Sequence, residues 1–339
     1  MRIPDIEPTL NDTQVLEFCN QGYLMLGDVV PDEINKRVTE FIREHPYKSK
    51  DGGGFEDDNL LKEDWFVENV ILNPQAAGAV RSLLGKNATL PTWMYNHQST
   101  TPKPVQGWHR DGCSRHGYEM NLLQVFYYPQ DTPLELGPTE VLPGSHFLFN
   151  LARYMGHYGS ISWSEHTVAP ASTIFITVYS IWHRRAASSA HGVRNMLKYL
   201  YWRMAPPQRD WIIKPDFNLD DLNDLENAAY SEVRPAQDQF RNWHDVAEMF
   251  FWLCGRMEDF PAFLGTERWP MGHPPAENLR IFTPFQGSCE APVATFGSSG
   301  VPPADPRRLA TGRDHGTFGS GATRPQAGLP ARPTTRWRP

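Results

Sequence analysis

Gly107-Trp108-His109-Arg110-Asp111-Gly112 is the stretch that decides both the fold and the chemistry expected of this 339-residue chain. A histidine and a carboxylate two positions apart on an extended segment project to the same side. One metal ion can therefore bind both side chains. Trp182-His183, much later in the sequence, offers a second imidazole. Two imidazoles and one carboxylate leave three metal positions open, which is typical of non-haem Fe(II) sites that bind a cosubstrate and O2.

A His-x-Asp triplet alone is weak evidence, because it occurs by chance in many chains of this length and a polar loop is its ordinary interpretation. A closed structural zinc site is disfavoured, since such sites usually draw on several thiolates. The four cysteines are scattered and show no Cys-x-x-Cys spacing, so they indicate neither a disulfide framework nor a thiolate metal site.

The pattern around the triplet predicts a mainly β core, because short apolar and aromatic runs separated by proline and glycine begin near residue 89. Strands are expected at residues 93–95, 122–128, 174–179 and 196–204. This pattern predicts a double-stranded β-helix, or jelly roll, made of two packed antiparallel sheets. The separation of 74 residues between His109 and His183 fits ligands that come from strands distant in sequence.

Helical periodicity flanks this β region on both sides. Residues 9–45 predict two helices around a short strand, and residues 65–85 predict helix interrupted near Asn73-Pro74. After Pro206-Pro207 the chain is expected to turn helical, with one amphipathic helix at 235–254.

We therefore expect three regions: a jelly-roll domain with N-terminal helices at 1–204, a helical extension packed on that core at 205–290, and a disordered tail at 291–339. The tail holds seven glycines, eight prolines and seven arginines with little to bury.

Composition excludes several classes of partner. A formal charge of −7 argues against non-specific nucleic-acid binding, which needs a basic face. No apolar run approaches the roughly 20 residues that span a bilayer, and the N-terminus lacks the apolar core of a secretory signal. The expectation is a soluble cytoplasmic protein that acts on a small molecule. Oligomeric state leaves no signal in the sequence.

With these motifs the chain resembles the phytanoyl-CoA dioxygenase family of Fe(II)- and 2-oxoglutarate-dependent oxygenases. The matching pieces are Trp108-His109-Arg110-Asp111, Gly137 to His146 (Gly-Pro-Thr-Glu-Val-Leu-Pro-Gly-Ser-His), and His183 followed at eleven residues by Arg194. The N-terminal part of the chain also matches, at Gln14-Val15, Phe18, Gly22-Tyr23-Leu24 and Pro31-Asp32-Glu33-Ile34. The similarity therefore covers roughly residues 9–204.

The resemblance implies that His109, Asp111 and His183 bind Fe(II), and that Arg194 holds the distal carboxylate of 2-oxoglutarate. A guanidinium suits that task because its planar fork pairs with both carboxylate oxygens. Gln98 is implied as a contact to the other end of the cosubstrate, with Lys103 and Gln124 as alternatives.

Other arginines and histidines near the motifs receive lesser roles. The alternative carboxylate clamps, ranked below Arg194 because they lack its spacing, are Arg184, Arg185 and Arg203. The histidines expected to be structural or surface residues are His97, His116, His146 and His191.

The implied reaction is hydroxylation or desaturation of an unactivated C–H bond in a small or medium metabolite, with O2 consumed and succinate and CO2 released. A carboxylate at Asp111 disfavours the related halogenases, which have a small residue there. The alternatives are a cupin-like metalloenzyme that does not use 2-oxoglutarate, and a non-catalytic jelly-roll protein. Aromatic residues of the 122–128 and 196–204 strands are expected to line the substrate pocket.

Overall fold

The computed structural model divides the chain into two compact units, Met1–Phe285 and Gln286–Pro339. The described residues all lie in the first unit: 6–45, 60–111, 116–148, 154–155, 157–217 and 236–260, with side chains from 244 onward in the last range. The predicted tail at 291–339 and large parts of the predicted extension (218–235 and 261–290) lie outside the described residues.

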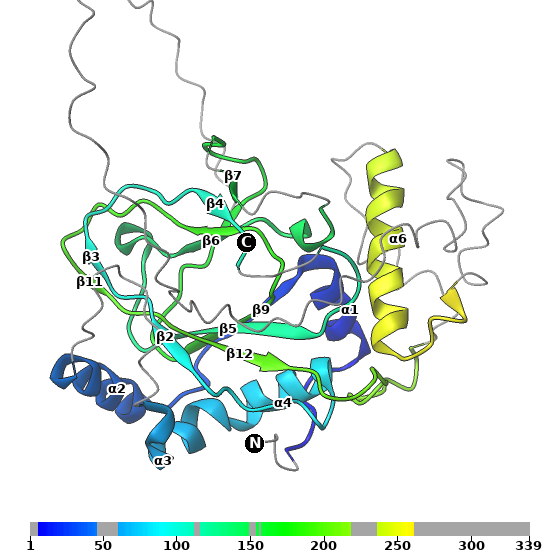
Figure 1. Ribbon diagram of the computed structural model, residues 1–339, viewed down its shortest axis with the longest axis horizontal. Helices are drawn as coiled ribbons and strands as arrows, with labels where there is room; N and C mark the ends of the chain where they lie inside the picture. The colour runs from blue at the N-terminus through cyan, green and yellow to red at the C-terminus, as the bar shows by residue number, and fades with distance from the viewer. Residues whose placement is uncertain are drawn as a thin grey trace, which may run out of the picture. The chain divides into compact units, whose positions relative to one another are not determined.

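The protein contains two five-stranded sheets (Figure 1). The sheet with the longer strands is called the larger sheet. In spatial order its strands are β1 (Tyr23–Leu26), β9 (Thr173–Val178), β5 (Leu122–Tyr128), β12 (Leu197–Trp202) and β2 (Met94–Asn96). Every neighbouring pair is antiparallel. The expected strands at 93–95, 122–128, 174–179 and 196–204 are confirmed, with small shifts at their ends.

The smaller sheet is built from short strands. Its order is β7 (Tyr154–Met155), β4 (Trp108–His109), β10 (His183–Arg185), β6 (Thr139–Val141) and β8 (Glu165–His166). A two-stranded ribbon joins β3 (Ser99–Thr101) to β11 (Gly192–Arg194). Two antiparallel sheets with pairing between strands distant in sequence are the architecture of a jelly roll, so the predicted fold class is confirmed.

The N-terminal helices begin and end near the residues that the sequence indicated. They are α1 (Asp12–Gln21), α2 (Asp32–Glu44), α3 (Asp64–Phe66), the π-helical η2 (Val67–Ile71) and α4 (Pro74–Leu84). A capping box between Asn11 and Gln14 starts α1, and Gly22, with a left-handed φ of 78°, ends it. Asn73 caps α4, with Pro74 in its first turn. Three short 3-10 helices are also described: η1 (Leu60–Lys62) before α3, and η3 (Leu134–Leu136) and η4 (Ser145–Phe147) between strands.

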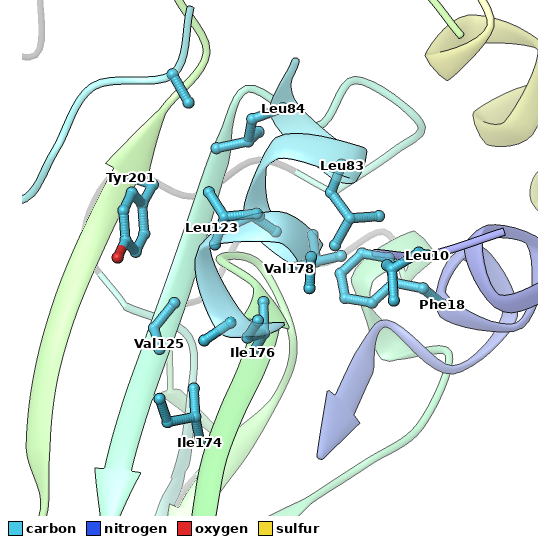
Figure 2. Packing of buried hydrophobic residues seen from close by; sticks show 14 of the residues in the cluster. Leu10, Phe18, Leu83, Leu84, Leu123, Val125, Ile174, Ile176, Val178 and Tyr201 are labelled. Carbon is cyan, nitrogen blue, oxygen red and sulfur yellow. The ribbon is translucent and has the colours of Figure 1, made fainter. Parts of the chain in front are cut away.

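The main core lies on one face of the larger sheet. Leu123 and Val125 of β5 and Ile176 of β9 lie on the face of the sheet that α4 covers, and they share one cluster with Leu83 of α4 (Figure 2). Because side chains alternate along a strand, the neighbouring residues of β5 face the smaller sheet. There Phe126, Tyr128 and Phe175 belong to a second buried cluster. The space between the two sheets is therefore lined by one set of alternate residues.

The helix predicted at 235–254 is confirmed as α6 (Ala236–Leu253), whose Val246 and Phe250 belong to the main core beside α1. The expectation that the chain turns helical directly after Pro206-Pro207 is wrong for residues 205–217, which form no helix. Their backbone instead runs beside the start of α1, where the Ile212 amide donates to the Leu10 carbonyl.

A buried carboxylate fixes this segment to α1. Asp12 is fully buried, and its Oδ1 accepts hydrogen bonds from Arg209 Nε at 2.8 Å and Trp211 Nε1 at 2.7 Å. The backbone N–H of Lys214 donates to Oδ2 at 2.8 Å. A buried charge needs such partners, so α1 and residues 209–214 depend on each other.

No helix among the described residues has both the length and the apolar character to cross a membrane.

His146 gives the protein a pH-dependent stability. The ring is fully buried on η4, and its Nε2–H donates to the Cys19 carbonyl at 3.0 Å. Burial lowers the pKa of His146 to about 4, whereas an unfolded histidine has a pKa of about 6.5. Below pH 6.5 the unfolded chain takes up a proton that folded His146 does not, so the folded state loses stability as pH falls. The loss ends near pH 4, where both states are protonated.

We expect this residue to contribute about 3 kcal/mol to the fall in unfolding free energy between pH 7 and pH 4. Urea denaturation of wild type and His146→Gln across that range measures it: the variant is less stable at pH 7 but varies less with pH. His191→Gln, at an exposed position, serves as the control. Parallel pH profiles for wild type and His146→Gln would contradict the prediction.

Candidate metal centre

The two predicted metal-binding histidines are cross-strand neighbours. His109 on β4 pairs directly with His183 on β10, and their ring centroids lie 4.5 Å apart. Asp111 follows β4 by two residues. Its Oδ1 lies 4.0 Å from His109 Nε2 and its Oδ2 lies 3.6 Å from His183 Nε2. One ligand atom from each of the three residues falls within 4.8 Å of the others, so the fold brings together all three side chains.

Backbone carbonyls orient both rings. His109 Nδ1 lies 3.0 Å from the Gly107 carbonyl, and His183 Nδ1 lies 3.0 Å from the Ile181 carbonyl. A carbonyl only accepts, so each Nδ1 carries a proton, and each Nε2 lies on the side of the ring nearer Asp111. Burial, followed by the charge of His183, lowers the pKa of His109 to about 4. A neutral imidazole is the form that binds metal, so these donors fit a divalent cation.

Lys198 on β12 is a part of this site that the sequence did not reveal. Its ammonium donates to Asp111 Oδ2 at 2.8 Å and lies 5.7 Å from the Tyr95 ring centroid. Burial would raise the pKa of Asp111, but His183 and Lys198 outweigh it and hold that pKa well below its usual range. The alternation of β12 already placed Lys198 on the face opposite Tyr199. The packing of the two sheets shows that this face of β12 is directed toward the metal-binding side chains.

Arg194 on β11 is a buried cation whose surroundings are nearly neutral. Its side chain is 1% exposed, its Nη2 donates to Thr139 Oγ1 at 3.1 Å, and its guanidinium lies 6.0 Å from the Tyr128 ring centroid. Its Nε has no hydrogen-bond partner, and no carboxylate among the described residues pairs with it. Burying an unpaired charge is costly, so this position suits an anionic ligand.

The alternative clamps are engaged elsewhere. Arg184 donates to Glu140 Oε2 at 2.6 Å on the face of β10 opposite His183. Arg185 donates to the Pro104 carbonyl at 2.7 Å. Arg203 donates to three backbone carbonyls, those of Leu83, Leu84 and Met120.

A family-model comparison matches residues 18–157 to phytanoyl-CoA dioxygenase (PhyH), which confirms the resemblance noted in the sequence. The matched segment contains His109 and Asp111. Over this segment the chain is similar to phytanoyl-CoA dioxygenase. Iron as cofactor, with 2-oxoglutarate and O2 as cosubstrates, is the set that this type of enzyme uses, and the two histidines and the aspartate supply a matching set of donors.

Solved structures with a similar chain trace include HygX from Streptomyces hygroscopicus with nickel and 2-oxoglutarate bound, at 13% identity and a TM-score of 0.46 over 60% of this chain and 90% of that one. EctD from S. alaskensis in its apo form shows 15% identity and a TM-score of 0.46 over 62% and 86% of the two chains. No curated protein sequence matches the chain.

In this candidate site, Gln98 is exposed, and its Nε2 donates to Asn195 Oδ1 at 3.0 Å. Its neighbour His97 is affected by the charges of the centre, including those of Asp111 and Lys198. Burial, followed by the charge of Lys198, lowers the pKa of His97 to about 3, and its Nε2 has no hydrogen-bond partner. The sequence favoured a structural role for His97 and did not indicate this proximity.

The expected aromatic lining of the substrate pocket is only partly correct. Phe126 faces the centre, with its ring centroid 6.0 Å from that of His183. Tyr127, Tyr199 and Tyr201 lie instead in the main core on the opposite face of the larger sheet. The strands were predicted correctly, but only alternate residues of each can reach the site.

Proposed function

We propose that the protein hydroxylates or desaturates an unactivated C–H bond of a small or medium metabolite, coupled to decarboxylation of 2-oxoglutarate. The observation that carries this proposal is the convergence of His109, Asp111 and His183 on one point, with the buried Arg194 guanidinium nearby on the same side of the larger sheet. Bound iron would supply the oxidation of the C–H bond by O2.

The roles of the side chains follow from their chemistry. His109, Asp111 and His183 would hold the iron on one face and leave the other face open to ligands. Arg194 would pair with the distal carboxylate of 2-oxoglutarate, for which Thr139 and Tyr128 form a polar wall. His97 and Gln98 are the two candidates for a hydrogen bond to the keto-acid end. His97 is better supported, because its Nε2 is buried without a partner.

We also propose that the catalytic unit extends beyond the jelly roll. Residues 1–204 would supply every side chain named above. Residues 209–214 and α6 would complete the core through Asp12 and the apolar contacts of Phe250. The part of the 205–290 extension that is described would thus be a structural element of one domain.

The test of this proposal needs no substrate. Anaerobic titration of the iron-loaded protein with 2-oxoglutarate is expected to give the weak visible charge-transfer band of the chelate. In Arg194→Met the same band is expected at much higher 2-oxoglutarate concentration. Truncating one partner of a buried charge pair costs about 2–5 kcal/mol, which is a rise in dissociation constant of roughly 30-fold or more.

Arg185→Met is the matched control, because it removes a neighbouring guanidinium whose contacts are with backbone carbonyls. Its 2-oxoglutarate affinity should stay near that of wild type. Equal affinity in Arg194→Met and wild type would refute the clamp. Absence of the band from folded, iron-loaded wild type would favour a metalloenzyme that does not use 2-oxoglutarate, or a non-catalytic protein.

A further inference from the structure

Gln124, in the middle of β5, carries a buried amide that nothing around it satisfies. The residue is fully buried, and neither its Nε2 nor its Oε1 has a hydrogen-bond partner. Buried side-chain polar atoms in native proteins nearly always have partners, and an exception calls for an explanation. Thr177 on β9 does not provide one, because its hydroxyl bonds to the Gln124 backbone carbonyl at 3.3 Å. On β12 the register partner is the apolar Leu200.

The amide lies on the face of the larger sheet that carries the candidate metal centre. Leu123 and Val125, on either side of it, point toward the helices (Figure 2). Gln124 therefore points into the space between the sheets, on the same face as Phe126 and Tyr128.

The contacts of alternate residues along β5 place Gln124 on the side of the metal centre away from Arg194. Tyr128 lies beside the Arg194 guanidinium, and Phe126, two residues back, packs against His183. A cosubstrate held between Arg194 and the iron would cover this part of the strand. Gln124 is a further two residues away from the clamp, about 6.6 Å along the strand. It thus lies beyond the iron, on the side left for the primary substrate.

We propose that Gln124 is a specificity-determining residue that binds an amide group, a carboxamide or a lactam, of the primary substrate. The inference rests on the proposed function, since it needs 2-oxoglutarate to occupy the Arg194 side. An amide presents one donor and one acceptor in a plane, which complements the acceptor Oε1 and donor Nε2 of glutamine. A carboxylate would leave Oε1 unsatisfied, and an ammonium would leave Nε2 unsatisfied.

The first experiment needs no substrate and compares Gln124→Met with wild type. The variant replaces an unsatisfied buried amide with an apolar side chain of similar length, so its Tm is expected to rise by a few degrees. Its 2-oxoglutarate affinity and visible band are expected to stay unchanged. Gln130→Met is the matched control: that glutamine bonds to Val193 and Asn195, so its replacement should lower the Tm.

A lower Tm in Gln124→Met would show a structural role and overturn the proposal. A tenfold or larger loss of 2-oxoglutarate affinity would also overturn it, by placing Gln124 on the cosubstrate. Failure of wild type to bind 2-oxoglutarate at all would instead refute the proposed function, so the two failures can be told apart.

The second experiment identifies the ligand class. Succinate release is measured with a panel of carboxamides and lactams, each paired with its carboxylic acid, such as nicotinamide with nicotinate. Stimulation is expected from the amide half of the panel. In Gln124→Met and Gln124→Glu, kcat/KM for stimulating amides is expected to fall about 100-fold or more, because each replacement removes the Nε2 donor and leaves the amide carbonyl of the substrate unpaired. Stimulation by the acids alone, or by neither half, would overturn the amide assignment.

Discussion

Asp111→Ala is expected to lose iron binding and the 2-oxoglutarate-dependent visible band together. Asp111 supplies the sole carboxylate of the three-residue set, and its oxygens lie 3.6–4.0 Å from both histidine Nε2 atoms. Removal of a group that only hydrogen-bonds to a metal ligand already weakens metal binding about 10- to 100-fold. Loss of the ligand itself should therefore exceed about 100-fold. Anaerobic Fe(II) titration, with the metal content of the purified protein, measures this directly.

Lys198→Met separates loss of the ligand from loss of the ion pair. In that variant the Asp111 carboxylate remains, and only the ammonium at 2.8 Å is removed. Because Lys198 hydrogen-bonds to the ligand and does not itself bind the metal, iron affinity is expected to fall by no more than about 10- to 100-fold, less than in Asp111→Ala. Circular dichroism confirms that both variants are folded. Wild-type iron affinity in Asp111→Ala would rule out this carboxylate as a ligand.

Glu140→Ala is expected to be the most destabilising single substitution in the smaller sheet. Glu140 is 3% exposed, and its carboxylate accepts from Arg184 Nε at 2.6 Å and from Ser164 Oγ at 2.7 Å. The Arg184 guanidinium lies 4.4 Å from the Trp108 ring centroid. The network thus ties together β6, β10 and β4. Breaking a buried ion pair by removing one partner costs about 3–5 kcal/mol.

Urea denaturation at pH 7 measures this loss, with Glu135→Ala as the matched control at an exposed position. That control should stay within about 0.5 kcal/mol of wild type. The double variant Glu140→Leu with Arg184→Met leaves no unpaired charge, so it should be less destabilised than Glu140→Ala. A loss under 1 kcal/mol in Glu140→Ala would contradict the buried-pair account.

The sequence predicts the strands and the ligand set because both are local patterns. The 122–128 run is a continuous stretch of strand-forming residues and matches β5 residue for residue. The spacing of His109 and Asp111 places both side chains on one side of an extended chain whatever the remainder of the fold. These features need no knowledge of which strands pair.

Other parts of the site depend on pairing and could not be derived from the sequence. Lys198 reaches Asp111, 87 positions earlier in the chain, only because β12 lies in the sheet that faces β4. Whether His97 or Gln98 faces the centre depends on the alternation at one turn after β2. Residues 209–214 lie where the chain was expected to turn helical, but they form no helix and instead hydrogen-bond to the Asp12 carboxylate, a contact that the sequence alone does not show.

That last contact has a consequence for how the molecule can be divided. By its strands, the jelly roll is complete at Trp202. A chain cut there would keep Asp12 in the interior at the first turn of α1 and remove Arg209, Trp211 and the Lys214 amide, its donors. The smallest autonomous folding unit is therefore longer than the catalytic sheets. Residues 209–214 help to hold the first helix in place, and any recombinant fragment or circular permutant has to keep both partners of that contact.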